Sequence, residues 1–340
     1  MMPTHPRRRW SLDALLAIAL LIVLALVPVY AALAAQPFAL TLATRILIFA
    51  LAAVSLNLIL GYAGLVSFGH ALYLGLGVYV AGIMSFHGID NGWLQLLATL
   101  AVCALVGALT GSIALRTSGI AFIMITLAFA QMFFFLIVSL SRYGGDDGMT
   151  LAAASRYGTL PLSDARLLYG AAFVLLCAAL YGCRRLVHSR FGQVVCASRL
   201  NERRMKALGY PTFRYRLTAY VISAMVCGIA GLLYVNLTQF ASPSYMSWTT
   251  SGDLIAMVVL GGMATLTGPL FGAVGMILVE EWLKAMTQHW MVIFGPLIVL
   301  IVILSRQGLV GLLRGAEARW RGTPGGPGSA SPSAAGGEAQ

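Results

Sequence analysis

Most of this chain consists of apolar runs of about 15 to 25 residues, separated by short polar segments. About 20 apolar residues in a helix span the hydrocarbon core of a bilayer, and a helix satisfies its own backbone hydrogen bonds where no water can. Only 10% of the residues are charged, against about 25% in soluble domains. The sequence therefore predicts an all-α integral membrane protein with one transmembrane domain.

The apolar runs predict about ten transmembrane helices, and the weak separation of the last two leaves nine to eleven open. The expected helices cover, approximately, residues 12–35, 38–60, a run that ends near 86, 93–115, 119–140, 167–182, 217–240, 252–266, a run that ends near 286, and 290–304.

Basic residues lie mainly on one side of this predicted topology. Of the 22 Lys and Arg residues, 17 lie on the same predicted side of the membrane. Three precede the first helix, one follows the fourth helix, nine lie between residues 184 and 216, and four follow the last helix. This bias predicts that both chain termini and residues 184–216 are cytoplasmic. We expect a cytoplasmic N-terminus (1–10), a transmembrane domain (11–313) and a disordered cytoplasmic tail (314–340). Because the charges sit between apolar runs, the net charge of +11 is not interpreted as nucleic-acid binding.

The segment 184–216 holds nine Lys or Arg residues and a single acid, Glu202. Within it, Asn201 is a good N-cap, Gly209 a natural residue beyond a helix C-terminus, and Pro211 a stop. These signals predict a helix of about two turns at the membrane surface. Two interpretations remain open: a basic loop that only fixes topology through lipid headgroups, or an element that docks a cytoplasmic partner.

A second unusual stretch interrupts the apolar sequence between residues 57 and 70. Its glycines and polar residues predict either a broken helix beside a translocation path or an ordinary turn between helices. His70 is expected to be a packing residue and not a proton carrier. The candidate residues of this stretch are Asn57, Gly61, Tyr62, Gly64, Ser67, Gly69 and His70.

Several kinds of chemistry have no signal in the sequence. The loop from Gly144 to Gly148 lacks calcium-binding spacing, the five cysteines show no disulfide or zinc pattern, and no nucleotide-binding or catalytic motif occurs. We expect no cofactor and no enzymatic activity. Because no ionisable residue lies near the predicted centre of a span, energy supplied by a separate ATPase is favoured. The alternative is an ion-coupled or passive carrier or channel that works alone on a small polar solute.

Four stretches of the chain resemble the LivM-type permeases of branched-chain amino acid ABC importers, and the likeness extends over about residues 45–313. The most specific is the sequence LNLILGYAGLVSFGH at 56–70. The other three lie at 119–131, 189–209 and 258–273. In the helix before Ala207, Arg204 and Met205 depart from the family, which usually has alanines there.

The resemblance implies one half of an ATP-driven importer in the bacterial inner membrane. The implied partners are a LivH-type permease (or a second copy of this chain), two cytoplasmic ATPases and a periplasmic substrate-binding protein. The implied substrate is a branched-chain or other hydrophobic amino acid, while relatives also carry urea, amides and aromatic acids. The implied ATPase-coupling residues are Asn201, Glu202, Met205, Ala207, Leu208 and Gly209, and the implied binding-protein contact is Gly145, Asp146, Asp147 and Gly148.

Overall fold

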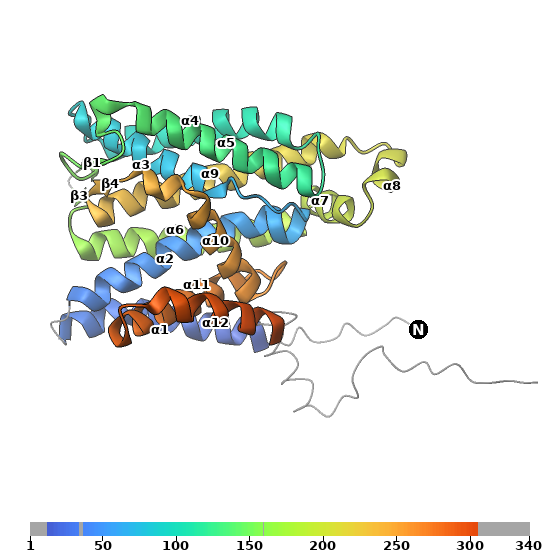
Figure 1. Cartoon of the computed structure of the whole chain (residues 1–340). Coiled ribbons are helices and arrows are strands. Elements are labelled where there is room, and N and C mark those ends of the chain that lie inside the picture. Colours follow the sequence, from blue (N-terminus) through green and yellow to red (C-terminus); the bar gives the residue numbers. More distant parts are fainter. Residues whose placement is uncertain (1–11, 34–36, 159, 305–340) are drawn as a thin grey trace, which may run out of the picture.

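The computed structural model describes residues 12–33, 37–158 and 160–304, which form an elongated helical bundle (Figure 1). Our expectations for residues 1–10 and 314–340 lie outside the described residues. The main helices are α1 (Leu12–Leu33), α2 (Pro37–Asn57), α3 (His70–Phe86), α4 (Gly92–Ala114), α5 (Ile120–Ser139), α6 (Ala165–His188), α7 (Arg190–Leu200), α8 (Glu202–Ala207), α9 (Thr212–Thr238), α10 (Trp248–Gly261), α11 (Gly268–Met286) and α12 (Trp290–Leu304).

A helix lies in each of the ten predicted ranges, so the predicted fold class, an all-α membrane protein, is confirmed. Among the described residues, five helices are long and apolar enough to cross a membrane by length and composition: α2 with the turn that follows it, α4, α5, α6 and α9. Shorter apolar stretches lie in α1, α3, α10 and α12.

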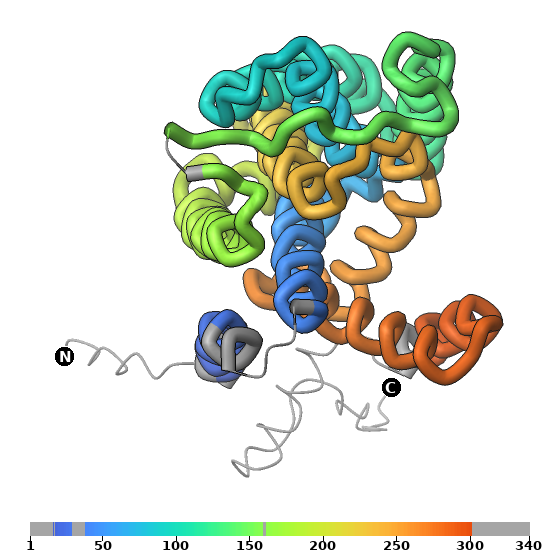
Figure 2. The backbone as a smooth tube through the Cα atoms, turned by 90° about the vertical axis from the view of Figure 1, so that its left-hand side faces the viewer, coloured from blue at the N-terminus to red at the C-terminus, as the bar shows by residue number. Residues whose placement is uncertain are grey.

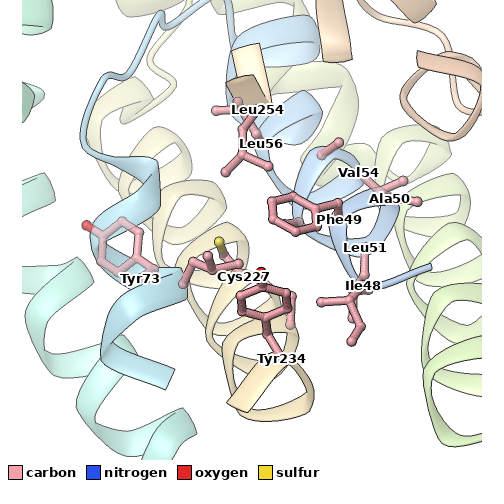
Figure 3. Close-up of a cluster of buried hydrophobic side chains, with 14 of the residues drawn as sticks. Ile48, Phe49, Ala50, Leu51, Val54, Leu56, Tyr73, Cys227, Tyr234 and Leu254 are labelled. Carbon is pink, nitrogen blue, oxygen red and sulfur yellow. The ribbon is translucent and has the colours of Figure 1, made fainter. Parts of the chain in front are cut away.

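Helix α2 is the centre of the bundle. Every residue from 46 to 61 is buried, as expected for a helix that is apolar on all sides. Figure 2, viewed along the bundle, shows α2 with other helices around it. The core cluster contains side chains of α2, α3 and α9, among them Phe49, Tyr73 and Tyr234 (Figure 3). The Phe49 and Tyr234 rings meet edge to face, with their centroids 5.3 Å apart.

Helices α3 and α9 approach each other through glycines. A Cβ on Gly77 would collide with the carbonyl oxygen of Gly228, and one on Gly231 would collide with the carbonyl oxygen of Leu74. Small residues allow this backbone contact, which is how membrane helices gain packing energy without a hydrophobic driving force.

The two ends of the bundle differ. At one end, β1 (Met149–Thr150) pairs with β4 (Phe240–Ala241), β2 (Arg156–Tyr157) pairs with β3 (Leu160–Pro161), and two short helices, η2 (Ser141–Tyr143) and η3 (Pro243–Met246), complete the connections. The opposite end carries α8 (Figure 1). We call these the β end and the α8 end.

The segment 184–216 is more helical than the sequence predicted. Helix α6 continues to His188, α9 already begins at Thr212, and α7 was not predicted at all. Ser189 starts α7 because its hydroxyl oxygen accepts a hydrogen bond from the Gly192 amide at 3.2 Å. The expected loop is therefore a compact helical cap on the bundle.

Candidate functional site at the α8 end

The predicted short helix is present as α8, with both predicted caps. The Asn201 side chain accepts a hydrogen bond from the Arg204 amide at 2.9 Å. At the other end, Gly209 has φ +85°, and the amides of Gly209 and Tyr210 donate to the carbonyls of Lys206 (3.0 Å) and Met205 (3.1 Å). This pair of bonds is a Schellman motif, so α8 is a defined element although it has only six residues.

Apolar side chains are exposed on both sides of α8. Leu200 is 87% exposed, Leu208 66% and Tyr210 43%. Ala207 and Gly209 are also exposed, while Met205 is half-buried. Apolar side chains that gather on a protruding polar element are typical of a surface that binds another protein.

Glu202 ties α8 to the neighbouring helices. Its carboxylate accepts hydrogen bonds from Arg216 of α9 at 2.6 Å and Lys206 at 2.8 Å. Arg216 also donates to the Ser198 carbonyl oxygen in α7 at 2.7 Å. Partial burial opposes ionisation of Glu202, but the hydrogen bond from Lys206 and the charge of Arg216 outweigh it and hold the pKa of this carboxyl below its usual value.

The stretch 57–70 is a largely buried break in helical structure, in which Gly64 is exposed. Helix α2 ends in a π-helical turn, η1 (Leu58–Ala63), after which Gly64 takes φ +71° and the chain stays non-helical until α3 begins at His70. Ser67 and Gly69 are buried within this irregular part, while Tyr62 is half-buried. Irregular backbone inside a membrane bundle requires such burial or a watery border, and π turns occur often at functional sites.

Asn57 fixes the break to the turn between α10 and α11. Its amide nitrogen donates to the Thr265 carbonyl oxygen at 2.8 Å, and its amide oxygen accepts from the Ala264 backbone at 3.2 Å. Gly61 lies against the same turn, since a Cβ there would lie 2.6 Å from the Ala264 nitrogen. Asn57 and Gly61 therefore form a close junction with the turn between α10 and α11.

His70 joins three helices. Its Nε2 lies 2.9 Å from the Ser55 hydroxyl of α2 and 3.4 Å from the Ser223 hydroxyl of α9. The Ser55 hydroxyl also lies 2.7 Å from the Ala52 carbonyl oxygen, so the tautomer with a proton on Nε2 satisfies both contacts of Ser55, with Ser55 donating to Ala52 and accepting from His70. The other ring nitrogen, Nδ1, has no hydrogen-bond partner among the residues described. These contacts fit the expected packing role.

The serines that hold His70 also line a cavity. A cavity of about 310 Å³ lies between α2, α6 and α9, with Ser55 and Ser223 in an otherwise apolar wall. An open surface hollow of about 380 Å³ shares Gly182, Leu186 and Ile222 with this cavity and reaches Arg185 towards the α8 end. Of the stretch 57–70, Leu58 lines the cavity between α2, α6 and α9, so the helix break borders space that an apolar molecule could enter.

The glycine-rich loop lies at the β end, away from the other two candidate groups (Figure 1). Gly145 is buried with φ +53°, Gly148 has φ +79°, and Asp146 and Asp147 are exposed. Within the described ranges, no group of three or more His, Cys, Asp or Glu side chains could hold a metal ion.

Two contacts between distant helical elements were not predicted from the sequence. Arg199 of α7 donates from Nη1 to the carbonyl oxygen of Gly61, which brings α7 and the helix break into contact. Arg45 of α2 forms an ion pair with Glu280 of α11 at 3.1 Å. Neither pairing has a local signal, because 138 and 235 residues separate the partners.

Comparison with known proteins identifies the family. A family profile described as the permease component of the branched-chain amino acid transport system matches residues 38–304. The LivM permease protein of Salmonella typhimurium is 27% identical over 80% of this chain and 70% of its own length. The probable LivM protein of Methanocaldococcus jannaschii is 26% identical over 75% and 88%.

The LivH permease protein of Escherichia coli K12 is 22% identical, over 77% of this chain and 91% of its own length. No solved structure matches the chain. The profile match extends from α2 to α12 and includes the helix break and α8. The chain therefore belongs to the permease components of branched-chain amino acid transport systems and is of the LivM type.

Proposed function

We propose that this chain is the transmembrane subunit of an ATP-driven importer that moves branched-chain or related hydrophobic amino acids across the bacterial inner membrane. Its partners in this proposal are a LivH-type permease or a second copy of itself, two cytoplasmic ATPases and a periplasmic substrate-binding protein. The substrate class follows the names of the relatives, which are branched-chain amino acid permeases. The α8 end faces the cytoplasm, as the distribution of Lys and Arg favours.

The observation that carries the proposal is the construction of α8. It is capped at both ends and flanked by exposed Leu200 and Leu208, and Glu202 holds it to α7 and α9 through Arg216. A short element fixed in this way moves with its helices as one body when a bound ATPase closes. We therefore assign ATPase coupling to Asn201, Glu202, Met205, Ala207, Leu208 and Gly209.

The remaining candidate residues serve substrate movement in this proposal. The break from Asn57 to His70 borders the apolar cavity between α2, α6 and α9, which suits an apolar side chain. The loop between η2 and β1 carries the exposed acids Asp146 and Asp147 between Gly145 and Gly148. It lies at the β end, opposite α8 (Figure 1), where a binding protein would dock.

A pair of glycine substitutions tests the ATPase-coupling role. Gly209 and Gly88 both follow a helix, with φ +85° and +76°, and the amide of each donates a hydrogen bond, to Lys206 and to Ser85 respectively. Proline cannot adopt a positive φ and has no amide proton. Gly209→Pro and Gly88→Pro should therefore disturb their helix ends to a similar degree, at opposite ends of the bundle.

The readouts are co-purification of the ATPases and ATP-dependent uptake in liposomes that contain the whole transporter. We expect Gly209→Pro to lose both while the protein still inserts in the membrane, and Gly88→Pro to keep both. Normal uptake by Gly209→Pro would contradict the assignment of α8. Uptake by the chain alone, driven by an ion gradient without ATPases, would contradict the proposed function itself.

A further inference from the structure

Arg216 makes α7, α8 and the start of α9 a single polar unit. Its guanidinium contacts Glu202 of α8 at 2.6 Å, and it donates to the Ser198 hydroxyl at 3.2 Å and the Ser198 carbonyl at 2.7 Å. The Arg216 side chain is only 12% exposed, so water screens these bonds little. Any displacement of α8 is therefore carried into α7 at Ser198.

Arg199, the next residue of α7, contacts the helix break. Its Nη1 donates to the Gly61 carbonyl oxygen in η1, and its Cγ would lie 2.6 Å from a Cβ on Gly64. The last carbonyls of a helix lack partners within the helix, and a cation there is favourable. The Arg199 guanidinium thus caps the α2–η1 helix, while its aliphatic chain lies beside Gly64, the exposed glycine that ends this helix.

On its other side, η1 is held by the α10–α11 turn. Asn57 bonds both Ala264 and Thr265, and Gly61 has no room for a side chain against that turn. The π turn is therefore held between a cap from α7 and a junction from α10–α11. A shift of the Arg199 cap would change one of these two restraints on the break.

We propose that Arg199 is a positioning residue that transmits movement of α8 to the π-helical break, and so links ATPase docking to the translocation path. This inference rests on the proposed function of α8. The effect of Arg199 is on the conformation of residues 58–64, through the Gly61 carbonyl and the Gly64 backbone.

The first test compares Arg199→Ala with Arg190→Ala, which removes an exposed arginine from the first turn of the same helix. Both variants are assayed in liposomes with the second permease, the ATPases and the binding protein, and the measured quantity is ATP hydrolysed per substrate imported. For Arg199→Ala we expect this ratio to rise about tenfold, the scale of one lost charge-assisted hydrogen bond, because hydrolysis continues and uptake falls. Arg199→Lys, which can still donate to Gly61, should recover part of the uptake. Arg190→Ala should behave as the wild type.

A labelling experiment reads the break directly. Val66 is a half-buried residue of the irregular segment, and Val66→Cys is introduced after removal of the five native cysteines. With an intact Arg199, the labelling rate should change between nucleotide-free and ATP-trapped complexes, and with Arg199→Ala or Arg199→Lys that change should be lost or reduced.

An unchanged ratio and an unchanged labelling response in Arg199→Ala would overturn the proposal, as would equal loss of hydrolysis and uptake in an assembled complex. These outcomes are distinct from failure of the proposed function. In that case the wild-type complex itself would show no ATP-dependent uptake.

Discussion

Asn57→Ala should weaken the junction between α2 and the α10–α11 turn. The substitution removes the 2.8 Å bond to Thr265 and the 3.2 Å bond from Ala264. A hydrogen bond contributes about 1 kcal/mol net, and more when its partner is left buried and unpaired. Ala264 and Thr265 are half-buried, so water can replace part of the loss. We therefore expect a loss of about 2 kcal/mol in the free energy of unfolding.

Thermal unfolding in detergent can be followed with a thiol-reactive dye, because Cys103 and Cys227 are fully buried. At about 2 cal/mol/K per residue, this loss lowers Tm by about 3 °C. The control is Asn91→Ala, which removes the exposed N-cap bond to Trp93 and should cost about 1 kcal/mol. Hydrogen exchange supplies a local readout, since the Ala264 amide loses its partner only in Asn57→Ala.

If the Ala264 amide exchanges faster in Asn57→Ala, and if the Tm of this variant falls further than that of Asn91→Ala, the stabilising role of the Asn57 junction is supported. If Asn57→Ala leaves the exchange of Ala264 unchanged and its Tm falls no further than the control, the reasoning about this junction is wrong.

Three further outcomes are expected. Gly231→Ala places a Cβ against the Leu74 carbonyl oxygen and should lower the free energy of unfolding by about 1–3 kcal/mol. The control, Gly252→Ala, has open space around the new Cβ and should leave the stability unchanged. The same dye assay compares the two variants. Ala264→Gly relieves a φ of +61° and should stabilise by up to about 1 kcal/mol. Because the pKa of Glu202 is lowered, its charge stabilises α8 above the usual value of 4.5 and this contribution is lost as the pH falls through the lowered pKa. Hydrogen exchange, corrected for its intrinsic rate, should therefore show less protection of α8 in Glu202→Gln at neutral pH, and no difference from the wild type in acid.

The features that could be predicted from the sequence are those with local causes. A run of apolar residues encodes its own helix, and α8 was predictable because Asn201 and Gly209 cap it within the same short segment. Helix α7 was missed because its sequence is mixed in polarity and lies between basic residues. Its N-cap, Ser189, is a weaker signal than the apolar runs on either side.

The arrangement around the helix break depends on contacts that are distant in the chain. Asn57 meets Thr265 across 208 positions, and His70 meets Ser223 across 153. The glycines at 61 and 64 predicted a broken helix or a turn, but only the packing of α7 and the α10–α11 turn determines how the break is held. For this reason the sequence left both a broken helix and an ordinary turn open, and it did not indicate the π-helical turn with which α2 ends.

The nine basic residues of 184–216 illustrate the same limit. Composition assigned them one common role, membrane orientation, and for exposed side chains such as Arg184 and Arg190 nothing more is required. Arg216 and Arg199 differ because each donates to a carbonyl oxygen of another helical element, Ser198 and Gly61 respectively. A positive-inside signal depends only on charge, so any Lys or Arg satisfies it. Capping of a particular carbonyl by a guanidinium depends on geometry as well as charge. The contrast between Arg199→Ala and Arg190→Ala therefore separates membrane orientation from capping within one helix.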